Sequence, residues 1–73
     1  MTEQELQLID QLFQGLRQQA SAPKDVQADA AIRQLATQVP DATYLLTQRS
    51  LLLEQALQQA QQQIAQLQSQ VPN

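Results

Sequence analysis

The chain has 73 residues, a net charge of −3, no Cys and no His. A chain this short rarely buries enough apolar surface to be stable alone, and the missing residue types exclude a disulfide framework and the usual structural zinc sites. Association with a partner is the remaining route to stability.

The distribution of charge and apolar residues excludes further classes of partner. Only four basic residues stand against seven acidic ones, and they form no basic stripe that would neutralise phosphates, so we expect no nucleic-acid partner. The N-terminus lacks the basic segment and apolar run of a secretory signal, and no stretch approaches about 18 uninterrupted apolar residues. We therefore expect a cytoplasmic protein without a membrane span.

The first predicted helix covers about residues 3–19. The Thr2 side chain precedes it and is placed to accept a hydrogen bond from the backbone N–H of Glu5. Apolar residues then recur every three or four positions and form a broad stripe. They are Leu6, Ile9, Phe13 and Leu16, flanked by Leu8 and Leu12. We interpret Gly15, which costs about 1 kcal/mol inside a helix, as a residue on an exposed face.

The second predicted helix covers about residues 26–38. A turn containing Ser21 and Pro23 precedes it, and Asp25 is its expected N-cap. It ends before Pro40, because a residue that precedes proline is disfavoured in the helical conformation. Its apolar positions are Ala28, Ile32, Leu35 and Val39.

The third predicted helix covers about residues 42–70, with the Asp41 side chain as its expected cap. Gln makes up 19 of the 73 residues and is densest after Glu54, where a disordered tract is the alternative. We predict a helix because neither Pro nor Gly interrupts it and because a set of mostly apolar residues keeps the alternating four- and three-residue spacing of a coiled coil. They are Leu46, Ser50, Leu53, Leu57, Ala60, Ile64, Leu67 and Val71.

These lengths predict an all-α fold in which two short helices form a hairpin packed on the long one. The short helices reach about 24 and 20 Å and the long helix about 43 Å, so the hairpin covers only its first half. Leu45 and Leu52 widen the apolar face there. The predicted hairpin core is Leu6, Ile9, Phe13, Leu16, Ile32, Leu35, Val39, Leu45 and Leu52. Tyr44 is expected to join it with its hydroxyl at the rim.

The apolar residues in the second half of the long helix are then left exposed. We expect a second copy of the chain to bury them in an intermolecular coiled coil or helical bundle. A homodimer is favoured and a tetramer comes next, in either orientation. In a parallel pair, Arg49 and Glu54 would form an interhelical ion pair worth at most about 1 kcal/mol. The predicted interface is Leu46, Leu53, Leu57, Ala60, Ile64, Leu67 and Val71.

No constellation of residues points to catalysis or to a cofactor. A nucleophile needs an adjacent base and an orienting group, and without His or Cys that set cannot be assembled. Asp25 and Asp29 lie one helical turn apart and could share a cation. We interpret them instead as part of a solvent-exposed helix face, which is the more common role of such a pair.

Four short motifs, in this order, resemble an uncharacterised bacterial family, the domain of unknown function 2076 (DUF2076). They are the opening Thr2-x-Glu-x-x-Leu-x-Leu-Ile-Asp-x-Leu-Phe13, then Lys24-Asp25, Pro40-Asp41-Ala42-x-Tyr44 and Glu54-Gln55-Ala56-Leu57. The resemblance implies no established activity. Members of that family carry a Gly- and Pro-rich tail, which implies that this chain is the N-terminal domain of a longer protein, and Thr43 stands where the family tends to have Pro.

The pattern as a whole predicts a single domain over residues 1–73 that acts as a homo-oligomerisation or scaffolding module and not as an enzyme. An adaptor that binds the helix of another protein along the same apolar residues is the alternative. Binding to a membrane surface is disfavoured, because the polar face of the long helix is Gln and lacks Lys and Arg.

Overall fold

The structure is a computed structural model, and residues 2–71 are the part of the chain that it describes. Within them the chain forms three α-helices and no strand: α1 (Glu3–Gln18), α2 (Val26–Ala36) and α3 (Ala42–Gln70). The predicted all-α class is confirmed. The first helix ends one residue and the second two residues before the predicted positions. Across this described range, no helix is both long enough and apolar enough to cross a membrane.

The two short helices begin with the predicted side-chain caps. The hydroxyl of Thr2 accepts a hydrogen bond from the backbone N–H of Glu5 at 3.1 Å. The carboxylate of Asp25 accepts from the N–H groups of Gln27 at 3.0 Å and Ala28 at 3.2 Å. Each cap satisfies N–H groups that have no partner within the helix.

The end of α2 tightens before the chain reaches Pro40. The N–H of Gln38 donates to the carbonyl of Leu35 at 3.1 Å, and the N–H of Val39 donates to the carbonyl of Ala36 at 3.2 Å. Both bonds span three residues, as in a 3₁₀ turn, and such turns commonly finish an α-helix. The last predicted turn of this helix is therefore replaced by the loop into α3.

Asp41 is the N-cap residue of α3, as predicted, but the predicted capping by its side chain is wrong. Asp41 has φ 60° and ψ 32°, in the left-handed region, and its side chain makes no capping hydrogen bond. An N-cap side chain reaches the free N–H groups of the first turn when its backbone is extended, which this conformation is not. Asp is among the few residues that tolerate the left-handed region, and here it lets the chain turn sharply between α2 and α3.

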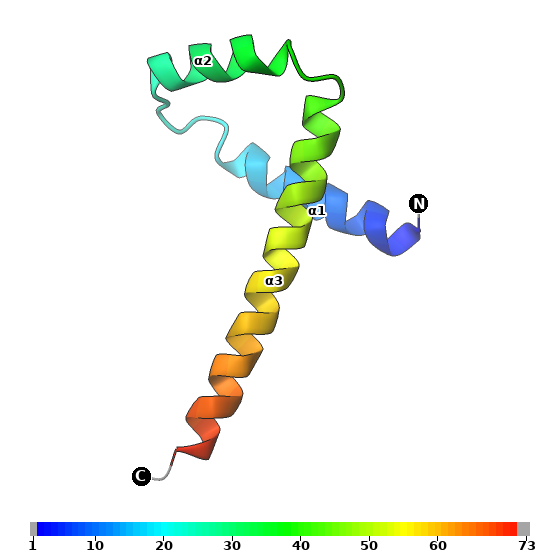
Figure 1. Ribbon diagram of the computed structural model, residues 1–73, viewed down its shortest axis with the longest axis vertical. Helices are drawn as coiled ribbons and strands as arrows, with labels where there is room; N and C mark the ends of the chain where they lie inside the picture. Colours follow the sequence, from blue (N-terminus) through cyan, green and yellow to red (C-terminus); the bar gives the residue numbers. More distant parts are fainter. Residues whose placement is uncertain (1, 72–73) are drawn as a thin grey trace.

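The helices do not form the predicted hairpin. Figure 1 shows α3 as a long rod, with α1 crossing its N-terminal half and α2 extending to one side from its N-terminal end, at a steep angle to α3. Tertiary contacts join chiefly α1 and α3. The short loop through Asp41 holds α2 across the end of α3, where it cannot lie beside α1.

The result is an open molecule. Its radius of gyration is 17.1 Å, whereas a compact chain of this length has about 11 Å. Its accessible surface is 6939 Å², whereas a compact protein of this mass exposes about 4,500 Å². None of residues 2–71 is fully buried.

The predicted hairpin core therefore does not form within a single chain. Ile9 is half-buried and Phe13 is 37% exposed. The other predicted members are all exposed: Leu6, Leu16, Ile32, Leu35, Val39, Leu45 and Leu52. Tyr44, expected at the rim of that core, is exposed as well.

Candidate functional site

The crossing of α1 and α3 is the best-packed part of the molecule. The half-buried residues at the crossing come from both helices: Ile9, Leu12, Thr47, Gln48, Ser50 and Leu51. The Thr47 hydroxyl donates to the carbonyl of Thr43 at 2.8 Å within α3, so it can lie beside apolar groups without losing its hydrogen bond. The crossing fixes the angle of α1 but covers only one side of α3.

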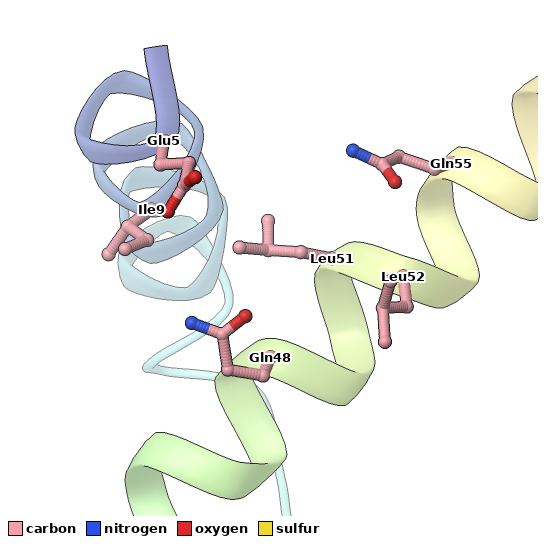
Figure 2. A pocket seen from close by; sticks show the side chains of 6 residues that line it. All are labelled: Glu5, Ile9, Gln48, Leu51, Leu52 and Gln55. Carbon is pink, nitrogen blue, oxygen red and sulfur yellow. The ribbon is translucent and has the colours of Figure 1, made fainter. Parts of the chain in front are cut away.

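A groove of about 200 Å³ lies on one side of the crossing, and Figure 2 shows its lining. Leu51 extends from α3 toward α1, where Ile9 lies, while Leu52 points away from α1. The polar lining consists of one carboxylate, Glu5, and two amides from Gln48 and Gln55. Amides supply neither a nucleophile nor a base, which leaves Glu5 as the one lining residue with a group of either kind.

The opposite side of the crossing is more apolar. A groove of about 240 Å³ there has Phe13 and Leu16 on α1 facing Leu46 and Ser50 on α3. Leu46 also lines a second groove of about 300 Å³ between α2 and α3, which we call the α2–α3 groove. Its lining is uncharged: Ile32, Leu35, Ala36, Val39, Ala42, Leu45 and Leu46. Several residues of the predicted core thus line an open apolar groove.

The residues that follow the coiled-coil spacing along α3 form one row, which we call the seam: Leu46, Ser50, Leu53, Leu57, Ala60, Ile64 and Leu67 on the helix, and Val71, which directly follows its last residue with an extended backbone. At about 100° per residue, Leu51 lies roughly 140° around the helix from Leu46, so α1 packs mainly on another side of α3. The first two seam residues, Leu46 and Ser50, still border α1 through the groove that they share with Phe13 and Leu16. Beyond the crossing, the seam extends along a part of α3 that no other helix approaches (Figure 1). There Leu57 is 58%, Ile64 53%, Leu67 64% and Val71 64% exposed.

The predicted interface residues therefore share one exposed face. The seam reaches the α2–α3 groove at Leu46, which belongs to both. Along α3 the charged residues are Arg49 and Glu54, and no charged residue follows Glu54 up to Val71. Glu54 lines a groove next to α1, together with Leu8, Leu12 and Gly15.

The charges of α2 are engaged with one another. Asp29 accepts a hydrogen bond from Arg33 Nε at 3.0 Å and lies 3.4 Å from Lys24 Nζ. The hydrogen bond from Arg33 lowers the pKa of the Asp29 carboxyl, and both cations add to this effect. Asp25 caps the helix, and residues 2–71 contain no group of three or more acidic, His or Cys residues that could hold a metal ion.

Two features were missed by the sequence reasoning. Leu51 carries the contact with α1, although Leu45 and Leu52 were expected to do so. Leu51 lines the groove at the crossing together with Ile9 of α1. The α2–α3 groove was also missed, because its shape depends on the turn at Asp41.

Comparison with known proteins gives a family and no characterised relative. No curated protein and no solved structure matches the chain. A bacterial protein family matches residues 1–73, which is the whole chain. The four motifs identified above lie inside this match. The chain therefore belongs to the family described as uncharacterized protein conserved in bacteria, DUF2076.

Proposed function

We propose that this chain is a homo-oligomerisation or scaffolding module that acts through the seam of α3 and has no catalytic role. One observation carries the proposal: the large apolar residues of the seam beyond the crossing are each more than half exposed, on a stretch that no other helix among residues 2–71 approaches. A row of this kind at coiled-coil spacing is the usual surface through which helices associate.

The energy available from covering the seam is large for so small a protein. Fully burying a Leu or Ile side chain contributes about 1.5–3 kcal/mol, so a residue that is half exposed has about 1 kcal/mol still to gain. Four such residues beyond the crossing offer about 4 kcal/mol per chain. Whole domains are stable by only about 5–15 kcal/mol.

The surface area supports the same proposal. The chain exposes 6939 Å², about 2,400 Å² more than a compact protein of its mass. Obligate dimers bury about 2,000–5,000 Å² in total, which is about 1,000–2,500 Å² per copy. A second copy covering the seam and the grooves beside it would remove most of this excess.

Such a module gathers whatever is attached to it. Linking copies through α3 raises the effective concentration of a tethered segment without any contact between the tethered segments themselves. The cytoplasmic location expected from the sequence is part of the same proposal, and fractionation of bacterial cells tests it.

Energy transfer between labelled copies tests the proposal. Chains fused to a donor and to an acceptor fluorescent protein, both monomeric variants, are mixed at micromolar concentration. We expect energy transfer that an excess of unlabelled chain abolishes. Its absence over the micromolar range would refute self-association.

The adaptor is the second candidate, and the neutral character of the seam favours it. Beyond Glu54 the helix carries only uncharged side chains, which impose no charge pattern that would exclude another helix. A chain that shows no energy transfer with itself but binds a synthetic amphipathic helix would support this candidate instead.

A further inference from the structure

We infer that the partner on the seam is a second copy of this chain lying antiparallel, with the C-terminal turns of its α3 reaching the α2–α3 groove. This inference rests on the proposed function and specifies the geometry of the same surface. It combines the order of side-chain sizes along the seam, the exposed groove at one end of the seam, and the distribution of charge.

The sizes of the seam residues distinguish the two orientations. The seam contains two small residues, Ser50 and Ala60, among large ones. In a parallel pair each residue faces its own counterpart, so Ser50 faces Ser50 and Ala60 faces Ala60, and both layers are underfilled. In an antiparallel pair, Ser50 can face the partner's Leu67 and Ala60 the partner's Leu57. Facing large with small residues fills the interface without cavities.

One antiparallel register uses the whole seam. With Leu57 opposite the partner's Ala60, the remaining pairs are Leu53 with the partner's Ile64, Ser50 with the partner's Leu67, and Leu46 with the partner's Val71. The two-fold symmetry of a dimer repeats each pair, so all eight seam residues have a counterpart. If the register is shifted by one heptad in either direction, two of the eight seam residues have no counterpart in the partner.

This register brings the end of one α3 to the groove of the other chain. Leu46 lines the α2–α3 groove, so the partner's Val71 and the partner's Leu67 arrive beside it. The groove at this point is uncharged, with Val39 and Leu45 close to Leu46 in its lining. Apolar residues that the single chain leaves exposed on α2 are then covered by the partner.

The charges are compatible with this arrangement. The part of α3 that enters the groove carries no charged residue between Gln55 and Val71, so docking buries no charge. Arg49 lies opposite the partner's Gln68 and does not meet the partner's Glu54, so the ion pair of a parallel dimer is not used. Glu54 instead lines the groove next to α1.

Spin-label distances test the orientation, because the chain has no Cys of its own and accepts single labelled positions. Ser69→Cys and Gln59→Cys each place a label on the side of α3 away from the seam. At about 1.5 Å per residue, the inferred register separates the two Ser69→Cys labels by about 31 Å along the helix axis and the two Gln59→Cys labels by about 1.5 Å. We expect the first pair to give a clearly longer distance than the second.

The outcomes separate this inference from the proposed function. Nearly equal distances for the two variants would show a parallel pair, which overturns the inference and leaves self-association intact. No measurable coupling in either variant would mean that the chain does not pair, which overturns both.

Disulfide formation in the Ser50→Cys variant under oxidising conditions is an independent test of the orientation. A parallel pair brings the two thiols close enough for a disulfide, whereas the inferred register holds them about 25 Å apart along the axis. We expect no disulfide-linked dimer from this variant. Efficient cross-linking would overturn the inference.

Discussion

Replacing Ile64 by Asp places a charge in the middle of the seam without touching the crossing of α1 and α3. Ile64 is 53% exposed in the single chain, so the proposed dimer would lose about 1 kcal/mol of apolar burial per copy. Holding a carboxylate against apolar neighbours costs about 2 kcal/mol more per copy. Because the change occurs in both copies, the dimer is weakened by about 6 kcal/mol, which is about four orders of magnitude in Kd.

Sedimentation velocity measures this change directly, with circular dichroism of the same samples reporting helicity. We expect Ile64→Asp to sediment as a monomer at concentrations where the unmodified chain is a dimer. Gln62→Asp is the matched control, since it adds the same charge on the opposite side of α3 from the seam and should leave the dimer intact. An unchanged oligomer in Ile64→Asp would refute the assignment of the seam, and dissociation of both variants would point to a general effect of charge.

Four positions outside the seam give further expected outcomes, all measured by thermal or urea unfolding followed by circular dichroism. Leu51→Ala removes a half-buried contact at the crossing and should destabilise the chain by about 1–2 kcal/mol, less than the 2–5 kcal/mol of a fully buried Leu; no effect would refute the crossing. A Cβ at Gly15 meets no atom within 4 Å, so Gly15→Ala should stabilise α1 by up to about 1 kcal/mol, and destabilisation would reveal a close approach. Asp41→Gly relieves a left-handed backbone at φ 60° and should raise the melting temperature, whereas Asp41→Val should lower it. The pKa of Asp29 is lowered by its hydrogen bond from Arg33, so its contribution to stability is complete above the ordinary carboxyl pKa and disappears as the pH falls through the lowered value. Asp29→Asn should remove that part of the pH dependence, and an unchanged profile would contradict the ion pair.

The helices themselves follow from local sequence signals. Thr2 and Asp25 cap their helices through short-range hydrogen bonds that depend only on residues two or three positions away. The absence of Pro and Gly within α3, together with its Leu, Ala and Gln content, favours one long helix. Such features can be predicted from the sequence because the interacting groups lie only a few residues apart along the chain.

The packing of the helices is less accessible from sequence. Leu51, Leu52 and Leu53 are consecutive and point to three different sides of α3, so periodicity alone does not tell which of them meets α1. The predicted hairpin failed for a related reason, since it required α2 to lie along α3. The left-handed conformation of Asp41 sends α2 across the end of the helix instead. An Asp after a Pro signals a cap and a turn equally well, so its backbone conformation could not be inferred.

The molecular mass of the chain in solution tests the central claim most directly. Sedimentation equilibrium at tens of micromolar should give twice the 8.2 kDa of the single chain, with dissociation on dilution. A mass of 8.2 kDa that persists to the highest concentration reached would contradict self-association through α3.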